Sequence, residues 1–155
     1  MKGNVKIIEQ LNARLTEELT AINQYMVHAE MCDNWKYEKL HKIIQKRAID
    51  EMKHAEKLIS RILFLEGRPV VSDLQKMNIG AEVPAMHQND RVAEETAIKN
   101  YNESVRISVE VGDNGTRELL EAILKEEEDH IDWLEAQLDQ IKQMGPQNYL
   151  VEQLD

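Results

Sequence analysis

The sequence predicts an all-α protein: a four-helix bundle with a long crossover between the second and third helices and a short fifth helix at the C-terminus. Three observations support this fold. Four long segments carry apolar residues at alternating steps of three and four, as a core-facing helix requires. Glycine (6), proline (3) and aromatic residues (5%) are scarce, which favours long helices. One gap between the segments is too long for a hairpin turn.

The composition indicates one globular domain, residues 1–155, that buries roughly 70% of its unfolded surface. The net charge of -10 argues against a nucleic-acid partner, which requires a basic surface. A single cysteine, Cys32, excludes an internal disulfide and a CxxC site and fits the reducing cytoplasm. The first ten residues lack the pattern of a signal peptide, and no stretch approaches 18 apolar residues, so we expect no membrane span.

The first helix is expected from about Val5 to about Asn34, and Glu18 occupies a stripe position where an apolar residue is normal. The second helix is expected from about Tyr37 to about Glu66, ending at a glycine, and its stripe contains Glu51. The apolar members of the two stripes are Ile8, Leu11, Leu15, Ile22, Tyr25 and Ala29, and Ile44, Ala48, Ala55, Leu58, Ile62 and Leu65.

Residues 67 to 81 are rich in turn-forming residues and are expected to form the crossover, which lets the second and third helices run parallel. The third helix is expected from about Val83 to about Val111, with a weaker stripe that contains Glu94. The other members of that stripe are Met86, Asp90, Ala97, Tyr101 and Val105.

The fourth helix is expected from about Thr116 to about Met144, with Thr116 as its N-cap and Glu127 in its stripe. Gly145-Pro146 ends it, and residues 147 to 154 are expected to form the short fifth helix. The apolar stripe consists of Leu120, Leu124, Ile131, Leu134, Leu138 and Ile141.

Each of the four stripes therefore contains one glutamate, and burying an ionised carboxylate is costly unless it is paired or bound to a metal. Two of these glutamates precede a histidine by three residues, in Glu51-x-x-His54 and Glu127-x-x-His130, so each pair shares one helix face. In both halves of the chain a glutamate stands 33 residues before the Glu-x-x-His motif. This is the known ligand arrangement of ferritin-like di-iron proteins, so the match is to an established pattern.

The residue types suit a dinuclear iron site. Carboxylates favour Fe(II), Fe(III) and Mn(II), and one imidazole for each ion raises affinity. Bridging carboxylates hold two ions roughly 4 Å apart, close enough to deliver two electrons together to O2 or H2O2. The sequence therefore predicts a ferroxidase centre, both catalytic and metal-binding, formed by Glu18, Glu51, His54, Glu94, Glu127 and His130.

The chain resembles bacterioferritin, the haem-carrying iron-storage ferritin of bacteria, almost from end to end. The segments that carry the resemblance are the start MKG…LN, ELTAINQY (18–25), IDEMKHA (49–55), ILFLEG (62–67), EEDHIDWLE (127–135) and QNYL (147–150). The resemblance implies that Glu18 and Glu94 are terminal iron ligands and that Glu51 and Glu127 bridge the two irons. It also implies that His54 and His130 each bind one iron.

The resemblance further implies that Met52, one from each of two subunits, binds the iron of haem b or a related porphyrin; a methionine that merely fills a helix interface is the alternative. It implies a homo-oligomeric shell of 24 subunits that stores ferric mineral, with release through the haem and a small ferredoxin as electron donor. Tyr25 and Trp133 would serve in redox protection, or else only in packing.

Some positions depart from the family or have no assigned role. Lys46 stands where many members have a histidine, which puts an inner-surface iron site with Asp50 in doubt. In the run of acids at 126–129 only Glu127 is in core register, so the others are expected to face solvent. Four residues are expected to serve in packing or at the surface: His28, Cys32, His41 and His87.

Two other functions compete with iron storage. A di-iron peroxidase of rubrerythrin type would share the bundle and the site, but the chain lacks a CxxC segment. A non-catalytic helical scaffold would use the same glutamates and histidines as buried ion pairs, without metal.

Overall fold

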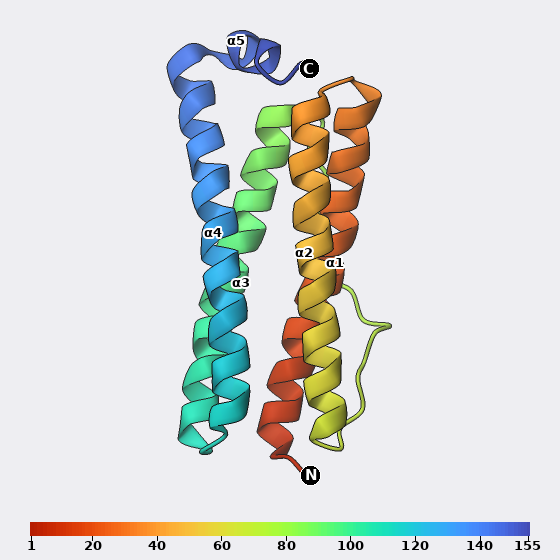
Figure 1. Ribbon diagram of the computed structural model, residues 1–155, viewed down its shortest axis with the longest axis vertical. Helices are drawn as coiled ribbons and strands as arrows, with labels where there is room; N and C mark the ends of the chain where they lie inside the picture. The colour runs from red at the N-terminus through yellow and green to blue at the C-terminus, as the bar shows by residue number, and fades with distance from the viewer.

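The computed structural model describes all residues, 1–155, and contains five helices and no strands. Four long helices form an elongated bundle, and the short fifth helix lies across one end of it (Figure 1). This confirms the predicted all-α fold. The helices are α1 (Val5–Asn34), α2 (Glu38–Phe64), α3 (Val83–Glu110), α4 (Asn114–Met144) and α5 (Pro146–Val151).

The crossover sets the topology of the bundle. Helix α2 ends near the N-terminus of the chain, the crossover returns along the bundle, and α3 begins at the opposite end, so α2 and α3 run parallel (Figure 1). Helix α1 packs against α2 and α3 packs against α4, while α1 also contacts α3. The two antiparallel pairs therefore face each other, as the repeated motif requires.

A row of polar side chains on α1 holds the crossover in place. Each accepts a hydrogen bond from a backbone N–H of a segment that has no regular structure of its own, and so satisfies a donor that would otherwise be unpaired. Three of the four are spaced by four residues and lie on one face of the helix. The pairs are Asn12 with Val70 (2.8 Å), Thr20 with Gln75 (2.9 Å), Gln24 with Asn78 (3.0 Å) and His28 with Gly80 (3.0 Å).

The helix ends differ from the predicted ones in detail. The prediction that Thr116 is the N-cap of α4 is wrong, because Asp113 takes this place and accepts hydrogen bonds from both the backbone N–H and the hydroxyl of Thr116. A carboxylate is a strong acceptor for first-turn donors, and Thr116 is buried inside the helix instead. Helix α2 stops at Phe64, two residues early, and α5 covers only Pro146–Val151.

The apolar core consists of two clusters with a polar layer between them. On α1, one cluster includes Leu11 and Leu15 and the other includes Tyr25 and Ala29, while Glu18 lies between these two groups in the sequence. The middle of the bundle is therefore occupied by charged side chains.

None of the five helices combines the length and apolar character that crossing a membrane requires.

Candidate metal centre

All six side chains predicted as ligands meet inside the bundle. They form two groups of four whose ligand atoms lie within 4.8 Å of one another, and both groups include Glu51 and Glu127. The first group is completed by Glu18 and His54, and the second by Glu94 and His130. We call these six residues the six-residue centre, and its two parts the Glu18–His54 half and the Glu94–His130 half.

The four carboxylates of the centre are almost completely removed from solvent. Glu18 is 3% exposed, and the other three are 1% exposed. Arg47, whose Nη2 lies 3.3 Å from Glu94 Oε1, is the only arginine or lysine that forms an ion pair with any of them. The acids are therefore neither turned into solvent nor neutralised as a set by basic side chains.

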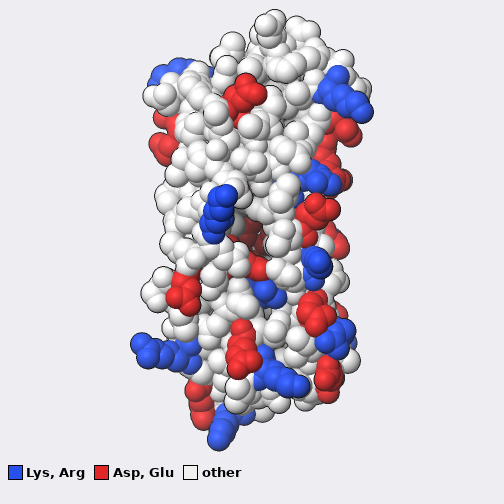
Figure 2. Space-filling view, turned by 180° about the vertical axis from the view of Figure 1, so that it is seen from behind, with Lys and Arg blue, Asp and Glu red and all other residues white.

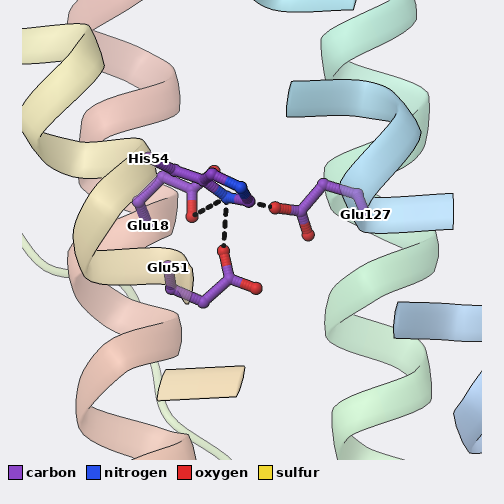
Figure 3. Close-up of side chains that lie close together, drawn as sticks. All are labelled: Glu18, Glu51, His54 and Glu127. Carbon is purple, nitrogen blue, oxygen red and sulfur yellow. Dashed lines mark hydrogen bonds and ion pairs between the residues drawn. The ribbon is translucent and has the colours of Figure 1, made fainter. Parts of the chain in front are cut away.

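In the Glu18–His54 half, three carboxylates surround one nitrogen of the imidazole ring (Figure 3). His54 Nδ1 lies 2.8 Å from Glu127 Oε1, 3.1 Å from Glu51 Oε2 and 3.6 Å from Glu18 Oε2. A ring nitrogen carries one proton at most and so donates one good hydrogen bond, which leaves the other two carboxylates without a donor. A cation placed among these four groups could be coordinated by all of them.

The Glu94–His130 half repeats this arrangement. His130 Nδ1 lies 3.0 Å from Glu51 Oε1, 3.4 Å from Glu94 Oε1 and 3.9 Å from Glu127 Oε2. Each carboxylate that the halves share turns one oxygen toward each imidazole. This is the geometry of a carboxylate that bridges two ions.

A carboxylate from outside the six-residue centre lies next to Nε2 of each imidazole ring. Glu126 Oε2 lies 2.7 Å from His54 Nε2, and Asp50 Oδ2 lies 3.2 Å from His130 Nε2. An ionised carboxylate only accepts hydrogen bonds, so Nε2 carries the proton and Nδ1 of a neutral ring is left as a metal ligand. Glu126, expected to face only solvent, therefore contacts the centre. The sequence signal was an acid directly before each Glu-x-x-His motif.

Two buried tyrosines orient the outer glutamates. The Tyr101 hydroxyl donates a hydrogen bond to Glu18 Oε1, and the Tyr25 hydroxyl donates one to Glu94 Oε1 at 2.7 Å. Tyr101 was predicted only as a member of the apolar stripe of α3. Each half of the centre thus contains a glutamate fixed by a phenol, and this matches the internal repeat of the sequence.

Some oxygens of the centre lack hydrogen-bond partners, which is unusual for buried polar atoms. Glu94 Oε2 has none. Glu127 Oε1 lies close to His54 Nδ1, as given above, but is not aligned with it for a hydrogen bond. Unpaired carboxylate oxygens beside two imidazoles form a donor set of the type that binds Fe(II), Mn(II) or Zn(II).

The pKa values reflect charges that are crowded together away from water. Burial, reinforced by the charge of Glu51, raises the pKa of Glu18 and of Glu127 well above the usual range. Burial alone would lower the pKa of the histidines, but hydrogen bonds and charges of the surrounding carboxylates raise it to about 11 for His54 and about 10 for His130. Without a metal, imidazolium protons thus supply the positive charge that the centre needs.

A hollow connects the centre to the surface between α1, α3 and the crossover. Its cavity measures roughly 160 Å³, and Figure 2 shows the hollow at mid-height with acidic side chains at its bottom. All four glutamates of the centre line it, and Lys76 of the crossover is another of its lining residues. A small ion therefore has a path to the carboxylates that avoids the apolar core.

The remaining candidates lie outside the six-residue centre. Met52 is 45% exposed although its neighbour Glu51 is buried, so it faces away from the centre. The ring of Trp133 lies 5.8 Å from the guanidinium carbon of Arg47. His28 and His87 are completely buried inside the bundle and are hydrogen-bonded to Asp90 and Tyr149, so neither is a surface residue.

Known proteins match nearly the whole chain. A family model described as the ferritin-like domain matches residues 8–144. A bacterioferritin from Rhodobacter capsulatus is 41% identical over 96% of this chain and 92% of its own length. A bacterioferritin from Streptomyces coelicolor is 43% identical (97% and 90%), and a bacterial ferritin from a Synechocystis species is 41% identical (99% and 99%).

Proposed function

This chain belongs to the ferritin-like family and, within it, to the bacterioferritins, and we propose that it is an iron-storage ferroxidase that oxidises Fe(II) at the six-residue centre. One observation carries the proposal: two groups of four buried ligand atoms share Glu51 and Glu127. Such a pair of groups binds two ions side by side, and two Fe(II) ions supply the two electrons that, with two protons, reduce O2 to H2O2 or H2O2 to water.

Each side chain has a role that follows from its position. Glu18, oriented by Tyr101, binds one ion, and Glu94, oriented by Tyr25, binds the other. The shared glutamates bridge the two ions. His54 and His130 each offer Nδ1. Because these imidazoles carry protons when no metal is bound, an entering ion displaces a proton from each ring, and iron uptake releases protons.

The hollow beside the crossover supports direct access to the centre. Fe(II) enters between α1 and α3, and the carboxylates at the bottom of the hollow attract it because the centre has more acids than bases. After oxidation, the extra charge on each ion repels its neighbour across the bridge. The ferric product then moves on toward the storage space of the assembled shell.

The test replaces both bridging ligands while keeping their volume. Anaerobic addition of Fe(II) to the parent protein gives two tightly bound irons for each chain, which are oxidised when air is admitted. Glu51→Gln with Glu127→Gln should abolish fast oxidation and leave the helical spectrum unchanged. The matched control is Glu56→Gln with Glu128→Gln, which changes two exposed glutamates on α2 and α4, the helices that carry Glu51 and Glu127. Unchanged oxidation in the first variant refutes the centre.

The haem site proposed for Met52 rests on the resemblance to bacterioferritins, and the exposure of this side chain on α2 is compatible with it. Met52, Met26 and Ile49 are all more than 40% exposed, which leaves apolar side chains on a surface of this helix pair. We propose that the Met52 thioether from each of two subunits would hold a shared haem b, which would supply a redox-active iron for reduction of the stored mineral. Met52→Leu should remove the haem spectrum from the purified assembly, while the control Met144→Leu keeps it. Haem retained by Met52→Leu rules out this ligand.

The proposed assembly is a hollow shell of 24 subunits, with a ferredoxin as electron donor for release through the haem. Particle mass measured together with metal content tests this directly, because a rubrerythrin-type peroxidase would not form a large shell. A scaffold without metal predicts no Fe(II) uptake by the parent protein. The unpaired Glu94 Oε2 speaks against such a scaffold, since purely structural ion pairs would satisfy their oxygens.

A further inference from the structure

We infer that Arg47 makes the Glu94–His130 half the weaker of the two metal-binding halves, so that the two ions are held unequally. The inference rests on the proposed function, because it concerns the affinity of the same centre for divalent cations. It goes beyond that function, because the repeated sequence motif by itself predicts two equal halves.

Arg47 places a permanent positive charge next to one half of the centre. The side chain comes from α2, is 3% exposed, and lies between Glu94 and Asp90, with 3.3 Å from Nη2 to Glu94 Oε1 and from Nη1 to Asp90 Oδ2. A guanidinium stays protonated even when it is buried. The charge therefore cannot be removed when a metal ion arrives.

The surroundings of Arg47 keep the guanidinium in place. Its central carbon lies 4.3 Å above the ring of Tyr25 and 5.8 Å from the ring of Trp133. Asp90, on the other side, is fixed in turn by Gln24 Nε2 at 2.8 Å and by His28 Nδ1 at 2.9 Å. Two aromatic rings and a fixed counter-ion therefore hold the guanidinium next to Glu94.

His28 does not add a second positive charge to this network. Its Nε2 accepts a hydrogen bond from the backbone N–H of Gly80 at 3.0 Å, so that nitrogen carries no proton. The ring is therefore neutral and donates from Nδ1 to Asp90. Asp90 offsets Arg47 only in part, because it pairs with Nη1 while Nη2 faces Glu94, so the guanidinium lies nearer to the Glu94–His130 half than the Asp90 carboxylate does.

The Glu18–His54 half has no such cation. Its glutamate accepts a hydrogen bond from Tyr101, as Glu94 does from Tyr25, and an arginine again lies over that tyrosine, with Arg14 6.0 Å from the Tyr101 ring. However, the donors of Arg14 go to Glu17, to Ser104 and to the carbonyl of Asn100. The two halves match in ligands and in phenols, and they differ in the guanidinium.

Two effects of Arg47 weaken metal binding in the Glu94–His130 half. A dication bound there is repelled by a fixed positive charge whose nearest nitrogen is 3.3 Å from one of its ligand atoms. In addition, Arg47 donates a hydrogen bond to Glu94 Oε1, the oxygen that lies 3.4 Å from His130 Nδ1, and so competes with an ion for that oxygen, whereas no arginine donates to Glu18. The Glu18–His54 half therefore fills first and empties last.

The test is a titration of the assembled, metal-free protein with Co²⁺ under anaerobic conditions, followed by its visible absorption and by calorimetry. Co²⁺ is the probe because its spectrum reports ligand geometry without oxidation. The parent should bind two ions in two separate steps. His54→Ala should remove the tighter step and His130→Ala the weaker one, which assigns each step to its half of the centre.

Arg47→Gln removes the charge and should tighten the weaker step at least tenfold, with the tighter step changed less than twofold. Arg47→Lys, which keeps the charge, should leave the two steps separated. The matched control is Lys53→Gln, the same charge change at an exposed position of the same helix. The inference is overturned if the two Co²⁺-binding steps stay equally far apart in Arg47→Gln, or if the affinity of the weaker step falls further. Either result would leave two-ion binding intact. A parent that binds no Co²⁺ overturns the proposed function as well.

Discussion

Sharing of Glu51 and Glu127 between the two halves predicts a stepwise pattern of metal-induced stabilisation. Each single Glu→Gln substitution keeps the side-chain volume but removes one ligand charge. Replacing Glu18 or Glu94 affects one half, whereas replacing either shared glutamate affects both. Zn²⁺ binds the same ligand types without redox chemistry. Adding it should therefore stabilise the parent by two increments, the Glu18→Gln and Glu94→Gln variants by one increment, and the Glu51→Gln and Glu127→Gln variants by almost none.

The size of each increment follows from mass action. A ligand that binds only the folded protein, at a free concentration a hundredfold above its dissociation constant, stabilises it by about 2.7 kcal/mol. With Zn²⁺ a hundredfold above the weaker of the two constants, the parent gains at least about 5 kcal/mol. For a domain of this size, about 1 kcal/mol shifts the melting temperature by about 2–4 °C, so the parent should gain about 10–20 °C.

Scanning calorimetry of metal-free and Zn²⁺-loaded protein measures these increments. Glu128→Gln is the matched control, since this exposed glutamate directly follows a shared ligand and should leave both increments intact. Equal losses in all four ligand variants would show that no glutamate is shared between two ions. A parent without any Zn²⁺-induced gain would show that cations do not compensate the buried acids.

Three further predictions concern groups away from the centre. Burial lowers the pKa of His87 to about 4, against about 6.5 in the unfolded chain. The associated stability is present above pH 6.5 and is lost as the pH falls toward 4, by about 3 kcal/mol, so urea unfolding of His87→Gln should show a shallower loss over that range than the parent does. Gly80→Ala places a Cβ against the backbone nitrogen of Met86, closer than van der Waals contact, and should lower stability by about 1–3 kcal/mol; an unchanged melting temperature would contradict this close approach. Cys32 is completely buried, and burial raises the pKa of its thiol to about 11, so a thiol reagent at pH 8 should label it only after unfolding in urea.

The sequence predicts the helices well because the signal for each extends over about thirty residues. Alternating steps of three and four, repeated many times, outweigh any single residue. A helix end depends instead on competition among a few neighbours, and Asp113 and Thr116 illustrate this. Both can cap a helix, but only the structure shows that the Asp113 carboxylate accepts both first-turn donors of Thr116.

The convergence of the six residues of the centre was predictable for a similar reason, since motif and spacing occur twice along the chain. Their partners were not, because these come from helices that meet only in the fold. Arg47 contacts Asp90 and Glu94 across 43 and 47 residues of sequence, and Glu126 reaches His54 across 72. No local pattern identifies such contacts, so the sequence predicts a symmetric centre and the structure has an asymmetric one.

This asymmetry would suit a ferroxidase centre of the kind proposed above, which releases its ferric product. Four buried carboxylates with only two imidazoles favour cations in both halves, and two equally tight halves would tend to retain ferric ions. A fixed charge next to Glu94 would act mainly on that half, because Arg47 forms ion pairs with Asp90 and Glu94 and with neither shared glutamate. Apolar clusters of ten buried residues each lie on both sides of the polar layer. Affinity in one half can thus be tuned by a single side chain, while the fold and the bridge stay the same.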